Sequence, residues 1–460
     1  MNTLKDLSIQ ILDCAGEDVA RLAATLLLFC RTKLDNLKRD LDDQETDRIY
    51  RQIRLEAYAI FQEHDDEILD RDVLSRLAQL FGTGDSLLAA KARAVAESLE
   101  EYFKKRLADC LTAQLPLEVR PNEAFPVANP PLKQIFGARL NTDPETMGSY
   151  DGLRYVRLGP PETNNIHVLV HSVDPNLFAN LTAGSKIAVG LPNEDLREFT
   201  WNESGVAPDL RFFGVKPLDS GQQLRLVTGI LNAADSTGAV LLVLPELSID
   251  ASVLQGIRDW WQTNRRTLSL LVAGSQHIEE GGVRRNRSVT LLPGRTEIAH
   301  DKFSRFYVRR RSPDGSAFDR VVEDIARAPA ISIHLAGDWS FAVLICKDLM
   351  DPTVRNLLEE LRVRIVLVPA CSPKTQIFEA YGYNLSVSAQ AVVVVANTPP
   401  EPQTSGVAAA SVGLFLQPLS GSALEAGPIQ MCTQEGLGLP AVAYVQLAVP
   451  GSLTVIQAQP

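Results

Sequence analysis

The sequence lacks the features of disulfide-stapled, zinc-binding and membrane-spanning proteins. Its six cysteines form no CxxC pair and no cluster with histidine, and a chain of 460 residues does not need disulfides to fold. No apolar run approaches the roughly 18 residues of a membrane helix, and the N-terminus has acidic residues where a signal peptide would be apolar. We therefore predict a cytoplasmic protein in a reducing compartment, with no membrane partner.

An excess of positive charge is also missing. The chain has 45 Lys and Arg against 56 Asp and Glu, for a net charge of −11, which disfavours general binding to nucleic acid. Hydrophobic residues make up 45% and charged residues 22%, a balance typical of folded globular proteins. The length indicates two or three domains.

Proline is absent before Pro116, and apolar residues recur there at the three- and four-residue spacing of amphipathic helices. We predict an all-α N-terminal module over residues 1–118. The many opposite charges at helical spacing in this region indicate solvated faces rather than a site.

Two further regions follow the helical module. Residues 119–205 contain frequent prolines and short strand-like runs, which predicts a proline-rich linker and a short β-like lead-in. In residues 206–460, predicted apolar strands alternate with predicted amphipathic helices, which is the pattern of a layered α/β domain.

Several catalytic motifs are absent, including phosphate-binding GxxxxGK[ST], GxGxxG, GxSxG and HExxH. Three residues stand out instead, because each follows a predicted strand or lies in a loop: Glu246, Lys302 and Cys346. Each also has an ordinary structural interpretation. Glu246 could cap a helix, Lys302 could be a surface residue, and a lone Cys346 could be an inert buried thiol.

Taken together and in this order, the segments around these residues resemble the nitrilase superfamily of carbon-nitrogen hydrolases, over about residues 209–447. The resemblance implies an αββα sandwich, a Glu-Lys-Cys triad and no metal or organic cofactor. The matched segments read LLVLPELS, LLVAGSQH, NRSVTLLPGRTEIAHDKF, FAVLICKDLMDPTVRNLLEELRVRIVLVPACSP, SAQAVVVVANT and SGVAAASVGLFLQPLSG.

The implied chemistry also follows from the residue types. A thiol is mostly protonated at neutral pH, so a nucleophilic Cys346 needs a base, for which Glu246 is placed, and a positive neighbour such as Lys302. The resemblance adds the backbone N–H of Lys347 as a second donor to the tetrahedral intermediate. A thioester would form on Cys346 and would then be hydrolysed by water that Glu246 deprotonates.

The segment after Lys302 departs from the family, whose members often have a second glutamate there. Either Glu323 or Asp319 is a candidate for this position. The same segment is basic, with Arg305 and Arg309, which would form either an anion-binding rim in the substrate pocket or a solvated docking surface.

Four residues near the later strands complete the prediction. Cys371 and Ser372 follow the strand after Cys346 and are candidates for the substrate pocket. Asp348 and Asn397 are expected to fix loops near the site through hydrogen bonds.

We thus predict a hydrolase that cleaves a non-peptide C–N bond in a small amide, N-carbamoyl compound or nitrile. The resemblance also implies a homo-oligomer, a dimer or higher. Two alternatives stay open: a non-catalytic sensor or scaffold whose helical module binds a protein partner, and an acyltransferase of the same superfamily that forms amides.

Overall fold

The computed structural model of the chain divides into two units, which are described separately. The helical unit comprises Met1–Asn129, Asn141–Asn165 and Leu169–Ser172, and the sandwich unit comprises Pro130–Leu140, Ile166–Val168 and Val173–Pro460. The residues described are 3–41, 44–64, 66, 68–82, 87–104, 106–113, 115–130, 132–136, 152–161, 166–207, 210–311, 318–373, 375–399, 411–418, 427, 429–433 and 437–460.

The helical unit confirms the predicted all-α module. Its helices are α1 (Leu4–Leu12), α2 (Val19–Thr32), α3 (Leu34–Leu41), α4 (Gln44–Glu63), α5 (Arg71–Gln79), α6 (Leu88–Phe103) and α7 (Arg106–Thr112). Aspartates accept backbone N–H bonds at the start of α2 and α5, where the first turn has no intrahelical acceptors. Helix α6 is alanine-rich and 11 of its 16 residues are buried, so it forms the centre of the unit.

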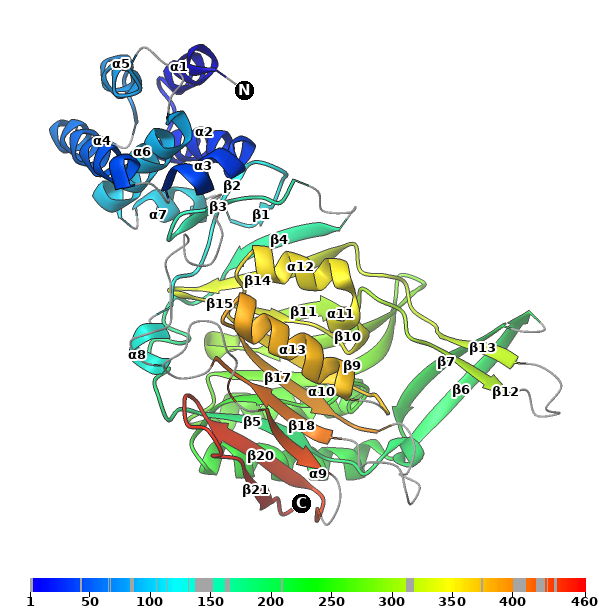
Figure 1. Cartoon of the computed structure of the whole chain (residues 1–460). Coiled ribbons are helices and arrows are strands. Elements are labelled where there is room, and N and C mark those ends of the chain that lie inside the picture. Colours follow the sequence, from blue (N-terminus) through cyan, green and yellow to red (C-terminus); the bar gives the residue numbers. More distant parts are fainter. Residues whose placement is uncertain are drawn as a thin grey trace. The chain divides into compact units, whose positions relative to one another are not determined.

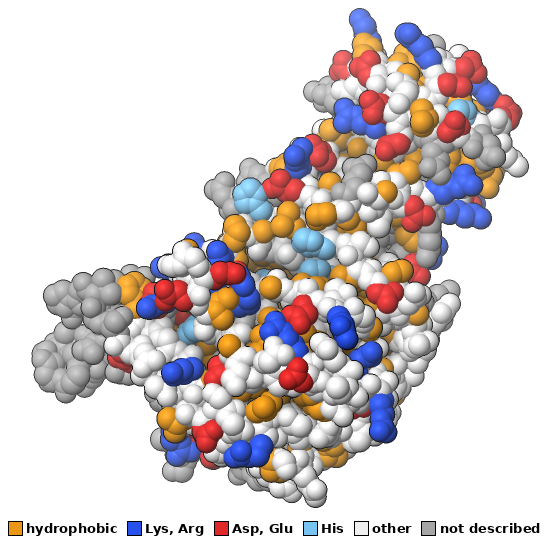
Figure 2. Space-filling model, turned by 180° about the vertical axis from the view of Figure 1, so that it is seen from behind, with side chains coloured by type: hydrophobic (Ala, Val, Ile, Leu, Met, Phe, Trp, Pro, Cys, Tyr) orange, Lys and Arg blue, Asp and Glu red, His pale blue; other side chains and the backbone are white. Residues whose placement is uncertain are grey.

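Several charged residues of the helical unit form solvated pairs. Arg51 contacts Asp47 one turn away, and Arg54 contacts Glu101 on another helix. Figure 2 shows acidic and basic side chains interspersed on the visible face of this unit. These pairs agree with the prediction of solvated faces, whereas Arg93 on α6 is buried and departs from it.

Strands also belong to the helical unit. They are β1 (Leu117–Glu118), β2 (Ala124–Pro126), β3 (Val156–Leu158) and the end of β4 (His167–Ser172). The β2–β3 pair places Leu153, Val156 and Leu158 in the same hydrophobic core as the helices. The boundary predicted at residue 118 therefore lies too early, because these apolar side chains are buried against the helices.

The sandwich unit contains two sheets that share a core. One sheet has the order β11 (Glu297–Asp301), β10 (Val283–Leu291), β9 (Leu270–Glu280), β8 (Ala239–Val243), β5 (Lys186–Leu191), β20 (Ala441–Gln446) and β21 (Thr454–Gln457). The second runs through β14 (Ala330–Ala336), β15 (Trp339–Val343), β16 (Ile365–Ala370), β17 (Val392–Asn397), β18 (Ser411–Leu416) and β19 (Gln430–Thr433). Inward side chains such as Val189 and Val272 of the first sheet and Phe341 and Val394 of the second form one apolar cluster.

Helices cover the outer faces of both sheets, which confirms the predicted αββα sandwich (Figure 1). Helices α9 (Ser220–Ser236) and α10 (Ala251–Thr263) pack on the β5 sheet, while α12 (Pro352–Glu360) and α13 (Gln376–Ser388) lie over the β17 sheet. Two shorter helices, α8 (Leu132–Phe136) and α11 (Lys347–Met350), and the 3-10 turns η1 (Leu196–Glu198) and η2 (Pro293–Arg295) complete the helical elements described.

A third, four-stranded sheet belongs to the sandwich unit and has the order β12 (Tyr307–Arg311), β13 (Phe318–Glu323), β7 (Leu210–Pro217) and β6 (Phe199–Ala207). In Figure 1 the β6–β7 hairpin extends away from the two packed sheets. The run RFFGVKPL, near the start of the predicted α/β domain, forms most of β7 in this additional sheet.

The predicted boundary at residue 206 also differs from the structure. Strand β5 lies inside the segment that we assigned to a lead-in, yet it pairs with β8 and β20 inside the seven-stranded sheet. Its residues are apolar on both faces and almost all buried, as a strand between two layers requires. No helix among the described residues is long and apolar enough to cross a membrane.

Candidate active site

Strand ends of the sandwich bring the three predicted residues together. Glu246 follows β8, Lys302 follows β11 and Cys346 follows β15. The backbone N–H of Glu246 donates to the carbonyl of Ala370 at 3.3 Å, and that of Cys346 donates to Pro369 at 2.8 Å. Because Pro369 and Ala370 end β16, these bonds hold the loops of both sheets at one site.

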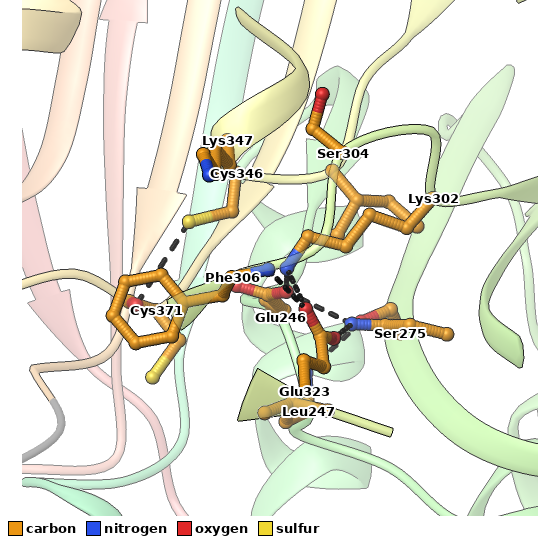
Figure 3. A network of polar contacts seen from close by, with 12 residues as sticks. Glu246, Leu247, Ser275, Lys302, Ser304, Phe306, Glu323, Cys346, Lys347 and Cys371 are labelled. Carbon is orange, nitrogen blue, oxygen red and sulfur yellow. Dashed lines mark hydrogen bonds and ion pairs between the residues drawn. The ribbon is translucent and has the colours of Figure 1, made fainter. Parts of the chain in front are cut away.

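A buried ion network occupies the centre of this site. The Lys302 ammonium donates to Glu246 Oε1 at 2.7 Å and to Glu323 Oε2 at 2.7 Å. The side chains of all three residues are at most 3% exposed. Figure 3 shows the Lys302 side chain reaching both carboxylates. Of the two candidates for a second acidic residue, Glu323 lies at Lys302, whereas the side chain of Asp319 is outside the described residues.

Two polar residues that we did not predict complete the network. The Asn286 amide on β10 donates to Glu246 at 2.9 Å and to Glu323 at 2.7 Å. His277 on β9 accepts the N–H of Val215 at its Nδ1 atom, at 2.9 Å, so its proton lies on Nε2, which is 3.1 Å from Glu323 Oε1. The only feature of the sequence that could have indicated these two residues is that each is a polar side chain within a strand.

The backbone at Cys346 has a conformation that residues with a side chain rarely adopt. Its φ is +49°, directly before α11 begins at Lys347. The thiol points toward the carbonyl of Cys371, with an Sγ to oxygen distance of 3.9 Å (Figure 3). Leu247, next to Glu246, also has a positive φ of 60°, and its N–H donates to Ser275 Oγ at 3.1 Å.

The pKa values in the site follow from burial and from the ion network. Burial raises the pKa of Glu246, and Lys302 only partly opposes that rise. Burial alone would lower the pKa of Lys302 and raise that of Glu323. The charges of Glu246 and Glu323 outweigh burial and raise the pKa of Lys302, and the charge of Lys302 is the largest cause that lowers the pKa of Glu323. Lys302 and Glu323 are therefore charged.

The pKa of the Cys346 thiol agrees with the predicted need for a base. Burial, and then the charge of Glu246, raise the pKa of Cys346 well above the ordinary value of 9.0, and Lys302 opposes them without reversing the shift. Cys346 therefore keeps its proton in the resting site, and a base must remove it when a substrate binds.

A small cavity of ≈ 30 Å³ opens onto the network. Its floor consists of Glu246, Lys302 and Glu323, and the rest of its lining is formed by Trp201, Phe213, Leu247, Phe306 and Cys371. Cys371, predicted for the pocket, thus lines this cavity. The aromatic lining was not predicted, because Trp201 and Phe213 come from a hairpin that precedes the quoted matched segments in the chain.

Solved structures similar to this chain include amidases of the nitrilase superfamily. A cysteine-to-alanine mutant of the Nesterenkonia AN1 amidase is 16% identical with a TM-score of 0.38, and the match covers 58% of this chain and 92% of that one. Glutamine-dependent NAD⁺ synthetase from Acinetobacter baumannii is 17% identical with a TM-score of 0.39, covering 60% and 48% of the two chains. No family model and no curated protein matches the chain.

The remaining predicted pocket residues lie around the site in different ways. The Lys347 side chain donates to the carbonyl of Arg305 at 2.9 Å and lies over the Tyr307 ring. Arg305 is exposed and is not among the residues that line the cavity, and the side chain of Arg309 is outside the described residues. Ser372 is buried, and its N–H donates to Asn397 at 2.8 Å.

Asp348 and Asn397 fix loops by hydrogen bonds, as we predicted. The buried Asp348 carboxylate accepts the N–H groups of Phe303, Ser304 and Ile345. It therefore links the loop after Lys302 to the turn before Cys346. The Asn397 amide donates to the carbonyls of Ser372 and Ser411 and holds the ends of β16 and β18 together.

Proposed function

We propose that the protein hydrolyses a non-peptide C–N bond, in an amide, N-carbamoyl compound or nitrile, through an acyl-thioester on Cys346. The observation that supports this most is the buried Lys302 ammonium held between Glu246 and Glu323 beside a cysteine with positive φ. A purely structural site would gain little from burying three ionisable side chains, because the desolvation of charged groups costs about as much as their attraction returns.

In the first step, Glu246 takes the thiol proton while the sulfur forms a bond to the amide carbon. The raised pKa of Glu246 brings it closer to that of the thiol, which suits a group that must both take and return a proton. The carbonyl π electrons move to oxygen, where Lys302 and the Lys347 N–H stabilise the negative charge. As the first residue of α11, Lys347 has no intrahelical acceptor for that N–H.

The tetrahedral intermediate then collapses, the C–N bond breaks, and Glu246 returns its proton to the departing nitrogen. Water attacks the thioester in the second step and gives a proton to Glu246. When the C–S bond breaks, the sulfur recovers that proton, so the acid product leaves and the resting thiol is restored.

Glu323, Asn286 and His277 act as positioning residues in this mechanism. Each contacts Lys302 or a carboxylate that contacts it. They hold the ammonium where the oxyanion forms, so that little reorganisation is needed during the reaction.

The first prediction tests this proposal with Cys346→Ala. Primary amides, ω-amides, N-carbamoyl compounds and nitriles are screened for release of ammonia or amine. The variant should lose turnover by at least about 10³-fold, because it lacks the proposed nucleophile beside Glu246. In the wild type, acid quenching during turnover followed by intact mass measurement should find an acyl group on Cys346.

Cys432→Ala is the matched control, since Cys432 is also buried but lies on β19 away from the site. It should retain full turnover. Undiminished turnover in a clean Cys346→Ala preparation would contradict the proposal. Adding hydroxylamine distinguishes hydrolysis from acyl transfer, since a transferase forms hydroxamate in preference to the acid.

A further inference from the structure

The four-stranded sheet contributes an inner face that covers the cavity. Phe213 on β7 is paired with Glu323 on β13, so the aromatic ring and the carboxylate lie side by side on one face. Trp201 on β6 is paired with Val215 and is therefore the diagonal neighbour of Phe213 on the same face. The sheet that carries a member of the ion network thus also carries the aromatic lining.

The aromatic side chains form a continuous wall. The ring centroids of Trp201 and Phe213 are 5.1 Å apart, and those of Phe213 and Phe306 are 6.5 Å apart in an edge-on arrangement. Phe213 is 3% exposed, whereas Trp201 is 40% exposed and forms the outer rim. Figure 3 shows Phe306 beside Cys371 and the ion network. Leu247 and Cys371 extend the apolar lining.

The charge of the cavity disfavours an anion. Two carboxylates and one ammonium form its floor, so acidic groups outnumber basic ones there. Lys302 is the one basic residue among the described residues that line the cavity, and both carboxylates already hold it. A carboxylate on a substrate would be desolvated against aromatic rings without a cation of its own.

We propose that this cavity binds the short, uncharged, apolar acyl group of the amide that Cys346 attacks. The four-stranded sheet then sets the substrate specificity, and Phe213 limits the length of the acyl chain. The volume of ≈ 30 Å³ is too small for a long chain, because one water molecule already requires about 10–15 Å³ of such space. This proposal deepens the proposed function and rests on it, and it replaces the anion-binding rim that the arginines of the sequence suggested.

The second prediction tests this specificity with propanamide, hexanamide, the anionic ω-amide succinamate and the cationic 4-aminobutanamide. In the wild type, kcat/KM for propanamide should exceed that for each of the other three by about 10-fold or more. In Phe213→Ala, the ratio of hexanamide to propanamide should rise by about 10-fold or more, because the side chain that closes the cavity is shortened.

Phe212→Ala is the matched control. Phe212 precedes Phe213 on β7, so its side chain points to the opposite face of the sheet. Phe212→Ala should leave the hexanamide-to-propanamide ratio of kcat/KM unchanged. Because shortening a buried phenylalanine can unfold the sheet, Trp201→Ala at the exposed rim serves as a second variant, and its ratio should rise in the same direction. The proposal would be overturned if the hexanamide-to-propanamide ratio of kcat/KM in Phe213→Ala, Trp201→Ala and Phe212→Ala equalled that of the wild type. A wild type that prefers succinamate or 4-aminobutanamide would also overturn it.

A binding measurement separates this specificity from catalysis. Calorimetry on Cys346→Ala, which lacks the thiol that would form the thioester, should show tighter binding of propanamide than of succinamate. If that variant binds propanamide selectively while the wild type releases no ammonia, the proposed hydrolysis fails and the apolar site stands. If the wild type turns over amides but Cys346→Ala binds succinamate more tightly, the apolar site fails and the hydrolysis stands.

Discussion

At the residue scale, the site depends on the balance of charge around Lys302. Two carboxylates, each at most 3% exposed, lie within 2.7 Å of its ammonium. Without that ammonium, Glu246 and Glu323 would be two buried charges of the same sign, held together by the Asn286 amide. Removing one partner of a buried ion pair lowers the free energy of unfolding by more than the intact pair contributes to it, because the other charge stays buried without a partner.

The third prediction is that Lys302→Met lowers the free energy of unfolding by about 3–5 kcal/mol at pH 8. In the wild type the pKa of Glu323 is lowered, so its contribution to stability is present above the ordinary Glu pKa and is lost as the pH falls below it. In the variant, burial and mutual repulsion raise the carboxylate pKa values. Protonation then stabilises the folded variant. The difference in the free energy of unfolding between variant and wild type, measured by urea unfolding, should therefore become smaller as the pH falls from 8 to 5.

Adding Glu323→Gln to Lys302→Met provides the control, because it removes the repulsion and keeps the side-chain shape. The double variant should recover much of the stability at pH 8. A difference between Lys302→Met and wild type that stays constant with pH would show that the carboxylates are not coupled to Lys302 as the contacts indicate.

At the scale of elements, a β-bulge in β9 shapes the loop that carries Glu246. The register between β9 and β10 shifts near Gly274, whose φ is +74°. A Cβ atom at this glycine would clash with the carbonyl of Pro245 and with Ser248 Oγ. These two residues flank Glu246 in the chain, so close approach of the β9 backbone sets the position of the base.

The fourth prediction compares Gly274→Ala with Gly238→Ala. Gly238 has a similar φ of +79°, but a Cβ there meets nothing within 4 Å. Gly238→Ala should therefore lower the free energy of unfolding by only about 1–2 kcal/mol, the cost of the left-handed conformation. Gly274→Ala should cost about 1–3 kcal/mol more and should slow acylation of Cys346, because the clash displaces Glu246. Equal effects of both variants on stability and acylation would contradict this role of the bulge.

At the scale of the whole molecule, the two units have separate hydrophobic cores. The core of the helical unit includes a buried arginine, Arg93, which is 1% exposed. Its guanidinium donates to Glu97 at 2.9 Å and to the carbonyl of Gly152 at 2.7 Å. Arg93 thereby ties α6 to the segment that leads into β3.

The fifth prediction is that Arg93→Met destabilises the helical unit by about 3–5 kcal/mol, because it leaves the Glu97 carboxylate without its buried partner. Helical circular dichroism should show an early unfolding transition in this variant. All four tryptophans lie in the sandwich unit, at positions 201, 260, 261 and 339, so tryptophan fluorescence should keep its wild-type transition.

Arg51→Met is the control for this experiment. The Arg51–Asp47 pair is exposed, so its loss should change the stability by less than about 1 kcal/mol. A fluorescence transition that shifts together with the helical signal in Arg93→Met would mean that the two units unfold as one.

The sequence by itself determined the elements and the three central residues of the site. Helical periodicity predicted the N-terminal helices, apolar runs predicted the strands of the sandwich, and strand-end positions pointed to Glu246, Lys302 and Cys346. These signals are local, because the spacing of apolar residues reflects the repeat of a single helix or strand. These signals can therefore be interpreted without knowing which elements become neighbours in the fold.

Only the tertiary structure decided the surroundings of those residues. Pairing of β13 with β7 places Glu323 beside Lys302 and brings Phe213 to the same face, although more than 100 positions separate Phe213 and Glu323 in the sequence. The raised pKa of Cys346 likewise depends on burial and on the proximity of Glu246, not on the residues next to it in the chain. Strand pairing and desolvation arise between distant segments, and no local pattern of residues encodes them.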